Sequence, residues 1–108
     1  MAAFFELRDY RIKDGKRDQW ARWMEETVIP FQIQRGMTVV GSWVDLRQPD
    51  RYVWMRRFES EEQHAALSKA VYEDPRWKAE FTPHIDEMLD RPRMVVTRLE
   101  ATPQSGLR

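Results

Sequence analysis

The residues of this chain that are best suited to chemistry alternate along its first predicted strand, Phe4 to Ile12. Glu6, Arg8 and Tyr10 are two positions apart, so in a strand they share one face at a spacing of about 7 Å. There Arg8 can bind an anionic or carbonyl oxygen, Tyr10 can donate a hydrogen bond, and Glu6 can orient Arg8. The alternative is a structural salt-bridge network, because a buried arginine needs a carboxylate partner.

The intervening residues of this strand, Phe5 and Leu7, occupy the opposite face. Because they are apolar, we expect them to pack against the helices of the domain. The polar face would then line a cavity between the sheets of two protomers.

Large aromatic residues on the next two predicted strands are candidates for the walls of the same cavity. Trp43, Tyr52 and Trp54 would form an aromatic-walled pocket for a flat, apolar ligand. The alternative is that these rings form the core of a dimer interface. Arg56 is assigned to the same cavity as a binding residue, with Asp45 as its expected partner.

The two histidines, His64 and His84, both fall in the inward register of predicted helices. Either could carry a proton or bind haem iron, and we place His84 with Arg8 and Tyr10 as the candidate catalytic set. The alternative for each histidine is a partly buried packing role. We expect no cofactor, with haem binding through His84 as the alternative.

Composition and missing motifs exclude several classes of function. The chain has no cysteine, no nucleotide-binding glycine motif and no metal-ligand spacing, so we expect no metal site. Lysine plus arginine and aspartate plus glutamate both number 18, which predicts no nucleic-acid partner. No apolar run is long enough to span a membrane, and no signal peptide is evident. We therefore expect a cytoplasmic protein that does not bind membranes.

Hydrophobic periodicity and turn residues predict one domain over residues 1–101, followed by a flexible tail over residues 102–108. Pro30 is expected to kink or restart the first helix near Ile29, and the Thr82-Pro83 pair to interrupt the last one. Ser60 begins a capping box that starts the second helical region. The predicted strands are residues 4–12, 38–46, 51–59 and 94–100. The first helix is predicted to begin near residue 15 or 16 and to end at a C-cap on Gly36, and the later helical regions are residues 61–72 and 75–89.

This order, β-α-β-β-α-β, is typical of a ferredoxin-like α+β plait with an antiparallel sheet and both helical regions on one face. We expect the rings of Trp43, Tyr52, Trp54 and Phe58 on the opposite face. An apolar face of that size would be buried if two sheets packed together, so we predict a homodimer.

The chain resembles the NIPSNAP family over most of its length. The resemblance rests on an ordered set of short motifs, none of them specific alone: Glu6-Leu7-Arg8-x-Tyr10, Lys13-x-Gly15-Lys16, Pro30, Gly36-Met37, Val40-Gly41-Ser42-Trp43, Phe58-Glu59-Ser60 and Asp74-Pro75-x-Trp77.

This resemblance implies the fold of the dimeric α/β-barrel superfamily, in which two plaits pack sheet to sheet. Relatives of that fold include cofactor-independent monooxygenases, haem enzymes and sugar mutarotases, whereas NIPSNAP members have no agreed reaction. The expectation is a dimer that binds a small apolar or aromatic molecule, and any catalysis would be a cofactor-independent oxygenation or isomerisation. The alternative is a non-enzymatic protein-interaction module.

Overall fold

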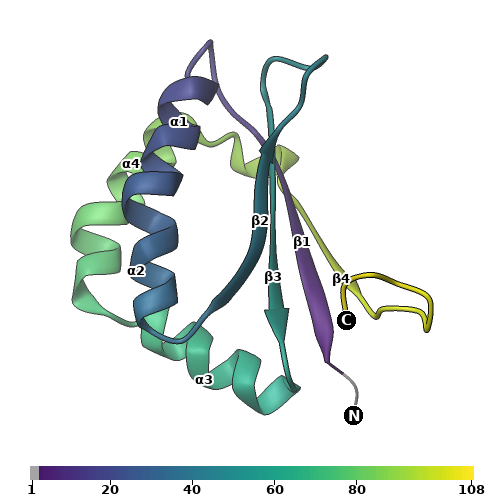
Figure 1. Ribbon diagram of the computed structural model, residues 1–108. Coiled ribbons are helices and arrows are strands. Elements are labelled where there is room, and N and C mark those ends of the chain that lie inside the picture. The colour runs from purple at the N-terminus through teal and green to yellow at the C-terminus, as the bar shows by residue number, and fades with distance from the viewer. Residues whose placement is uncertain (1–2) are drawn as a thin grey trace.

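The computed structural model describes residues 3–108 as a four-stranded sheet with helices along one face (Figure 1). The elements follow in the order β1 (Phe4–Arg11), α1 (Arg17–Trp23), η1 (Met24–Val28), α2 (Ile29–Gln34), β2 (Thr38–Val44), β3 (Arg51–Phe58), α3 (Glu61–Tyr72), η2 (Trp77–Phe81), α4 (Thr82–Met88), η3 (Arg91–Arg93) and β4 (Val95–Leu99).

The sheet has the strand order β2-β3-β1-β4, and every neighbouring pair is antiparallel. This arrangement confirms the predicted ferredoxin-like α+β fold. The two central strands, β1 and β3, place Glu6 opposite Arg56 and Arg8 opposite Trp54. Residues directly opposite on one face have touching side chains, so this register assembles polar groups that are far apart in sequence.

Both prolines that were expected to interrupt helices lie just after a π-helical turn. The N–H of Ile29 donates to the carbonyl of Met24, five residues back, immediately before Pro30. The N–H of Thr82 likewise donates to the carbonyl of Trp77 before Pro83. A proline ring clashes with the carbonyl four residues earlier in a regular helix, and a wider turn relieves that clash. The regular α-helix restarts at Ile29 and at Thr82, where the prolines predicted an interruption, and a π-helical turn precedes each restart without a gap in the helical region.

The predicted orientation of β1 is inverted. Tyr10 is buried and packs edge-on against Trp20 of α1, with ring centroids 5.9 Å apart. Glu6 and Arg8 share that face with Tyr10, so all three point toward the helices and away from the outer face of the sheet. The large rings of β3 bury more apolar area against the helices than Phe5 and Leu7 could. Because β1 pairs with β3, the face of β1 on the same side of the sheet also points toward the helices.

The predicted orientation of β3 is also inverted. Tyr52, Trp54 and Phe58 were expected on the face away from the helices, but all three belong to the buried core. Of the four rings that indicated a dimer interface, Trp43 remains on the outer face.

Trp43 does not share the face of Trp54. The pairing of β2 with β3 shifts between Val39 and Gly41, so Trp43 lies opposite Val53 on the outer face. Such an irregularity changes which side chains point inward after it, because side chains alternate along a strand. The Trp43 ring lies over Gly41, where an added Cβ would be 2.4 Å from the ring, and its side chain is 48% exposed.

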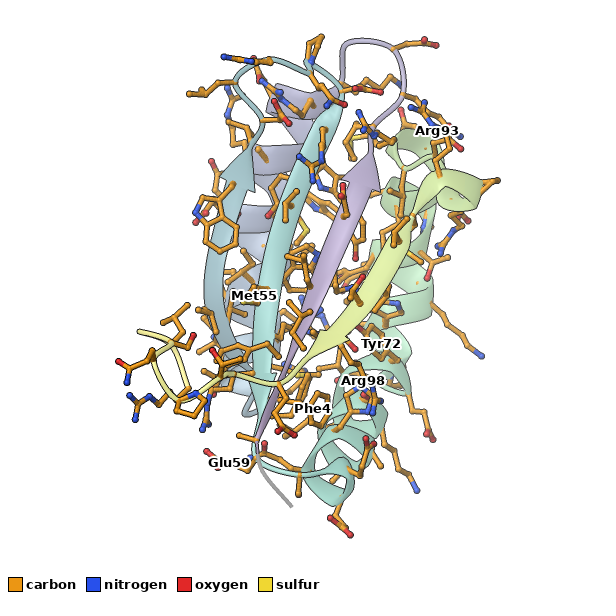
Figure 2. The ribbon with its side chains drawn as sticks, turned by 90° about the vertical axis from the view of Figure 1, so that its right-hand side faces the viewer. Phe4, Met55, Glu59, Tyr72, Arg93 and Arg98 are labelled. Carbon is orange, nitrogen blue, oxygen red and sulfur yellow. The ribbon has the colours of Figure 1, made fainter. Side chains whose placement is uncertain are left out.

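The outer face of the sheet has no helix over it, as Figure 2 shows with the helices behind the strands. Met55 lies on this face, and the C-terminal segment after β4 folds back across part of it (Figure 2). Arg57 Nε donates to the carbonyl of Arg108 at 2.6 Å. The apolar side chains exposed elsewhere on this face include Trp43 and Val95. Among the described helices, none is long and apolar enough to cross a membrane.

Candidate functional site

A polar cluster lies in the layer between the sheet and the helices, centred on Arg8. Arg8 Nε donates to the hydroxyl of Tyr10 at 2.7 Å, and Arg8 Nη1 donates to Glu6 Oε1 at 2.9 Å. The guanidinium carbon also lies 5.9 Å from the ring of Trp54. The hydrogen bonds fix the Arg8 side chain along β1, and the aromatic ring offers it a favourable negative face.

A second guanidinium, that of Arg56, lies behind the first and is 1% exposed. Its Nε and Nη2 donate to Glu6 Oε1 at 3.1 and 2.5 Å. Its Nη1 donates to Gln32 Oε1 and to the hydroxyl of Tyr72, both at 2.9 Å. Arg56 thus ties β3 to β1, α2 and α3. The expected pairing with Asp45 is wrong, because the carboxylate of Asp45 pairs with Arg51 at 3.0 Å.

Glu6 is held as a carboxylate by these two arginines. Burial by itself would raise its pKa, but the charges and hydrogen bonds of Arg56 and then Arg8 outweigh burial and lower the pKa from 4.5 to about 2. Its other oxygen, Oε2, lies 3.2 Å from His64 Nε2. A carboxylate with so low a pKa accepts a proton poorly near neutral pH, so Glu6 serves as an anchor and not as a general base.

A cavity of about 190 Å³ opens beside this cluster. Arg8, Tyr10 and Trp54 form its wall on the sheet side. The helical wall includes the two π-helical turns, which contribute Met24, Val28 and Trp77. The other lining residues come from helices and from the segment before β4: Trp20, Trp23, Gln32, Tyr72, Ile85, Leu89, Arg91 and Met94.

Three buried donor groups in the cavity wall have no hydrogen-bond partner among the described residues. These are the indole Nε1 atoms of Trp20 and Trp54 and the amide Nε2 of Gln32. A buried N–H without an acceptor costs on the order of 1–3 kcal/mol. The three residues line the cavity, and their unpartnered nitrogen atoms are covered by protein.

The predicted site residues divide into three groups. Arg8, Tyr10 and Trp54 meet at the cavity, as the sequence predicted, although this cavity lies inside one chain and not between two sheets. Glu6 and Arg56 support Arg8 from behind. Tyr52, Trp43 and His84 do not line the cavity.

Each of these three has a local reason for its position. Tyr52 is buried and shares a 2.6 Å hydrogen bond with Ser42. Trp43 lies on the outer face, as the strand irregularity requires. His84 is exposed and packs against Trp23 on the far side of the helices, with ring centroids 5.2 Å apart. Its predicted inward register was wrong because the π-helical turn in η2 advances the register before α4.

His64 lies where its predicted register placed it, at the inner edge of α3. Its ring packs on Phe4 and Phe58 at centroid distances of 5.9 and 4.7 Å. It reaches Glu6 but does not line the cavity.

Two important residues, Gln32 and Tyr72, were missed by sequence reasoning. Gln32 continues the row of Trp20, Met24 and Val28 at intervals of four, and a single polar residue in an apolar row was the signal that could have identified it. Tyr72 ends α3, and no local pattern connects it with Arg56.

Among residues 3–108, no three histidine, aspartate or glutamate side chains gather as a metal site would require.

A family model described as NIPSNAP matches residues 5–103 of the chain. No curated protein matches the sequence significantly. Among solved structures, a NIPSNAP family protein from Agrobacterium tumefaciens is 27% identical with a TM-score of 0.86, and the match covers 99% of this chain and 92% of that one.

Two further structures share the fold at lower identity. A NIPSNAP-like domain protein from Burkholderia xenovorans, described as uncharacterised, is 20% identical with a TM-score of 0.84, and the match covers 95% of this chain and 88% of that one. A proposed antibiotic biosynthesis monooxygenase from Bordetella bronchiseptica is 15% identical with a TM-score of 0.70, with coverage of 94% and 99%.

Proposed function

We propose a ligand-binding function for this chain, which belongs to the NIPSNAP family. The cavity between sheet and helices binds a small apolar or aromatic molecule, and the chain acts as a homodimer. The observation that carries the proposal is the cavity of about 190 Å³ with Arg8, Tyr10 and Trp54 in one wall. An apolar cavity of about 150 Å³ is sufficient for benzene, so this one has room for a single ring with a small substituent.

The chemistry of the wall supports binding and orientation of a ligand. Four of the chain's five tryptophans line the cavity, and their flat faces suit an aromatic or flat aliphatic body. Arg8 and Tyr10 can hold a carbonyl oxygen at one end. Any catalysis at this site would therefore act by stabilising charge on that oxygen, as an isomerisation or a cofactor-independent oxygenation requires.

A base for such a reaction would have to come from the ligand or from solvent. Glu6 has a lowered pKa and is held by two guanidiniums, and His84 is outside the cavity. Binding is accordingly the primary function that we propose, and the predicted catalytic role of His84 has no support from its position.

The homodimer is proposed on the outer face of the sheet. Leu7, Val53 and Met55 lie there on the two central strands, partly exposed and without a helix above them. Trp43 and Val95, 48% and 55% exposed, extend this apolar surface to the two edge strands. A large exposed apolar face commonly marks an interface, and a second copy of the same sheet is its matching surface.

The tryptophans themselves provide the test of the cavity. In a ¹⁵N-labelled protein, monocyclic aromatic probes such as toluene and benzoate should shift the indole N–H signals of Trp20 and Trp54. The indole of Trp43 serves as an internal control because it lies on the outer face. Signals are assigned by single Trp→Phe substitutions. If no probe moves a cavity indole, or if Trp43 alone responds, the binding proposal fails and the interaction-module alternative is favoured.

A further inference from the structure

We propose that the cavity selects anionic ligands, and that a small monocyclic carboxylate is the class it takes. This inference rests on the proposed ligand-binding function and specifies the polar end of the ligand. Three observations carry it: the charge of the buried cluster, the hydrogen-bonding character of the wall, and the size of the cavity.

The buried cluster holds more positive than negative charge. Arg8 and Arg56 are both paired with Glu6, and all their bonds to it converge on a single oxygen, Oε1. Among the described residues no second carboxylate pairs with either arginine. Two guanidiniums thus share one carboxylate, and one positive charge is left without a counter-charge. Leaving such a charge unpaired in a buried setting is costly, and an incoming anion would remove that cost.

The cavity wall presents cations and hydrogen-bond donors but no carboxylate. Of its charged lining residues, Arg8 lies on the sheet and Arg91 lies before β4, and none of the described lining residues is acidic. Arg91 is already paired with Asp86 at 2.8 Å, which leaves Arg8 as the cation available to a ligand.

Arg8 also has unused hydrogen-bonding capacity. Its Nε and Nη1 are committed to Tyr10 and Glu6, whereas its Nη2 donates to no described residue. The hydroxyl of Tyr10 accepts from Arg8 Nε and so keeps its own proton to donate. A carboxylate oxygen can accept from both groups, which a neutral or cationic end group does less well.

The buried tryptophan and glutamine donors point to the same chemistry. Trp20, Trp54 and Gln32 are at most 2% exposed, and the side-chain nitrogen of each donates to no acceptor among the described residues. All three residues line the cavity. A ligand that reached these N–H groups would need acceptor atoms, because an indole only donates hydrogen bonds. A carboxylate offers two oxygens with about four acceptor sites and no donor.

The cavity volume limits the body that carries this group. The cavity volume of about 190 Å³ is slightly larger than the volume of about 150 Å³ that is sufficient for benzene. The best-fitting class is therefore one ring, or an aliphatic group of similar size, attached to a carboxylate. Benzoate is the simplest member, and benzamide has nearly the same shape without the charge.

The test compares these two probes on the wild-type protein by calorimetry, with the tryptophan indole signals reporting where each binds. We expect benzoate to bind at least tenfold more tightly than benzamide, since hydrogen bonds to a charged acceptor are about twice as strong as neutral ones. Equal affinities, or tighter binding of benzamide, would overturn the anion inference and leave the ligand-binding function intact. Absence of binding by both probes would overturn the anion inference, and the ligand-binding function would fail with it if toluene also left the cavity indole signals unchanged.

Two variants test whether Arg8 is the residue that causes the preference for benzoate over benzamide. Arg8→Met keeps an unbranched apolar stem without the charge and should abolish the preference for benzoate, because benzoate loses a charged partner whereas benzamide loses only a hydrogen bond to a neutral acceptor. Arg51→Met is the matched control, because Arg51 is also ion-paired on the sheet but contacts Asp9 and Asp45 away from the cavity. Thermal unfolding checks that each variant is folded, and Arg8→Gln, which also removes the charge, replaces Arg8→Met if the latter does not fold. A preference that survives loss of the guanidinium would contradict the assignment to Arg8.

Discussion

Replacing Glu6 by glutamine tests whether one carboxylate holds the interior of this protein together. Glu6 is 4% exposed and is the shared partner of Arg8 and Arg56. Glutamine keeps the shape and an acceptor oxygen but removes the charge. The variant therefore leaves two buried guanidiniums without a counter-charge, and we expect it to be folded but clearly less stable than the wild type.

The size of the effect follows from two independent arguments. Removing one partner of a buried ion pair costs about 3–5 kcal/mol. The pKa of Glu6 is lowered from 4.5 to about 2 in the folded protein, and each pKa unit corresponds to about 1.4 kcal/mol. Both arguments give a loss of about 3 kcal/mol in the free energy of unfolding at neutral pH.

The stability difference between wild type and Glu6→Gln should also change with pH, in a direction that the pKa of Glu6 determines. Because the pKa of Glu6 is lower in the folded state, its carboxylate contributes its full stability above pH 4.5 and loses that contribution as the pH falls toward 2. The gap between wild type and Glu6→Gln should therefore be constant from about pH 7 to 5. At about pH 3.5 it should have narrowed by about 1 kcal/mol.

Urea unfolding, followed by tryptophan fluorescence at each pH, measures this gap. Glu80→Gln is the control, since Glu80 pairs with Arg76 on the surface and should contribute less than about 1 kcal/mol at any pH. A Glu6→Gln variant as stable as the wild type at pH 7, or a gap that does not narrow with acidification, would refute the account of the buried cluster.

Two further predictions concern the surface and the backbone. Val53→Glu, on the outer face of the sheet, should convert the proposed dimer into a monomer in size-exclusion chromatography with light scattering, and a wild type that is monomeric at high concentration would contradict the interface. Gly36→Ala should lower the free energy of unfolding by about 1–3 kcal/mol, because Gly36 has a φ of +100° and an added Cβ would lie 2.9 Å from Leu67. Gly41→Ala, which meets only the exposed ring of Trp43, should cost less, and equal costs would contradict the strain argument.

Local patterns in the sequence were sufficient to predict most of the elements. Alternation and turn residues placed all four strands within two residues of their observed bounds. Ser60 caps α3 as predicted, with its side chain accepting from the N–H of Gln63. These features depend on neighbours within a few residues, which is why a single sequence reveals them. The prolines marked where the regular helix restarts, but the π-helical turn before each one was not predicted, because it changes the hydrogen bonding without leaving a separate mark on the sequence.

The candidate site was predicted only in part, for a physical reason that its residues illustrate. Arg8, Tyr10 and Trp54 were correctly brought together, because β1 and β3 are neighbours in this fold and strand alternation selects one face of each. Trp43 lies on the outer face, as predicted, but a one-residue irregularity in β2 separates it from Trp54. His84 was misplaced by the extra residue of η2. A shift of one position reverses the direction of a strand side chain, so small irregularities have large consequences for a site.

The sequence by itself determined that Glu6, Arg8 and Tyr10 share one face of a strand in an antiparallel ferredoxin-like sheet. Only the tertiary structure decided that this face points toward the helices, where Gln32 and Tyr72 complete the cluster around Arg56. The reason is that the period of a strand is a property of the local chain. The choice between its two faces depends on which one buries more area against distant helices, and no short segment contains that information.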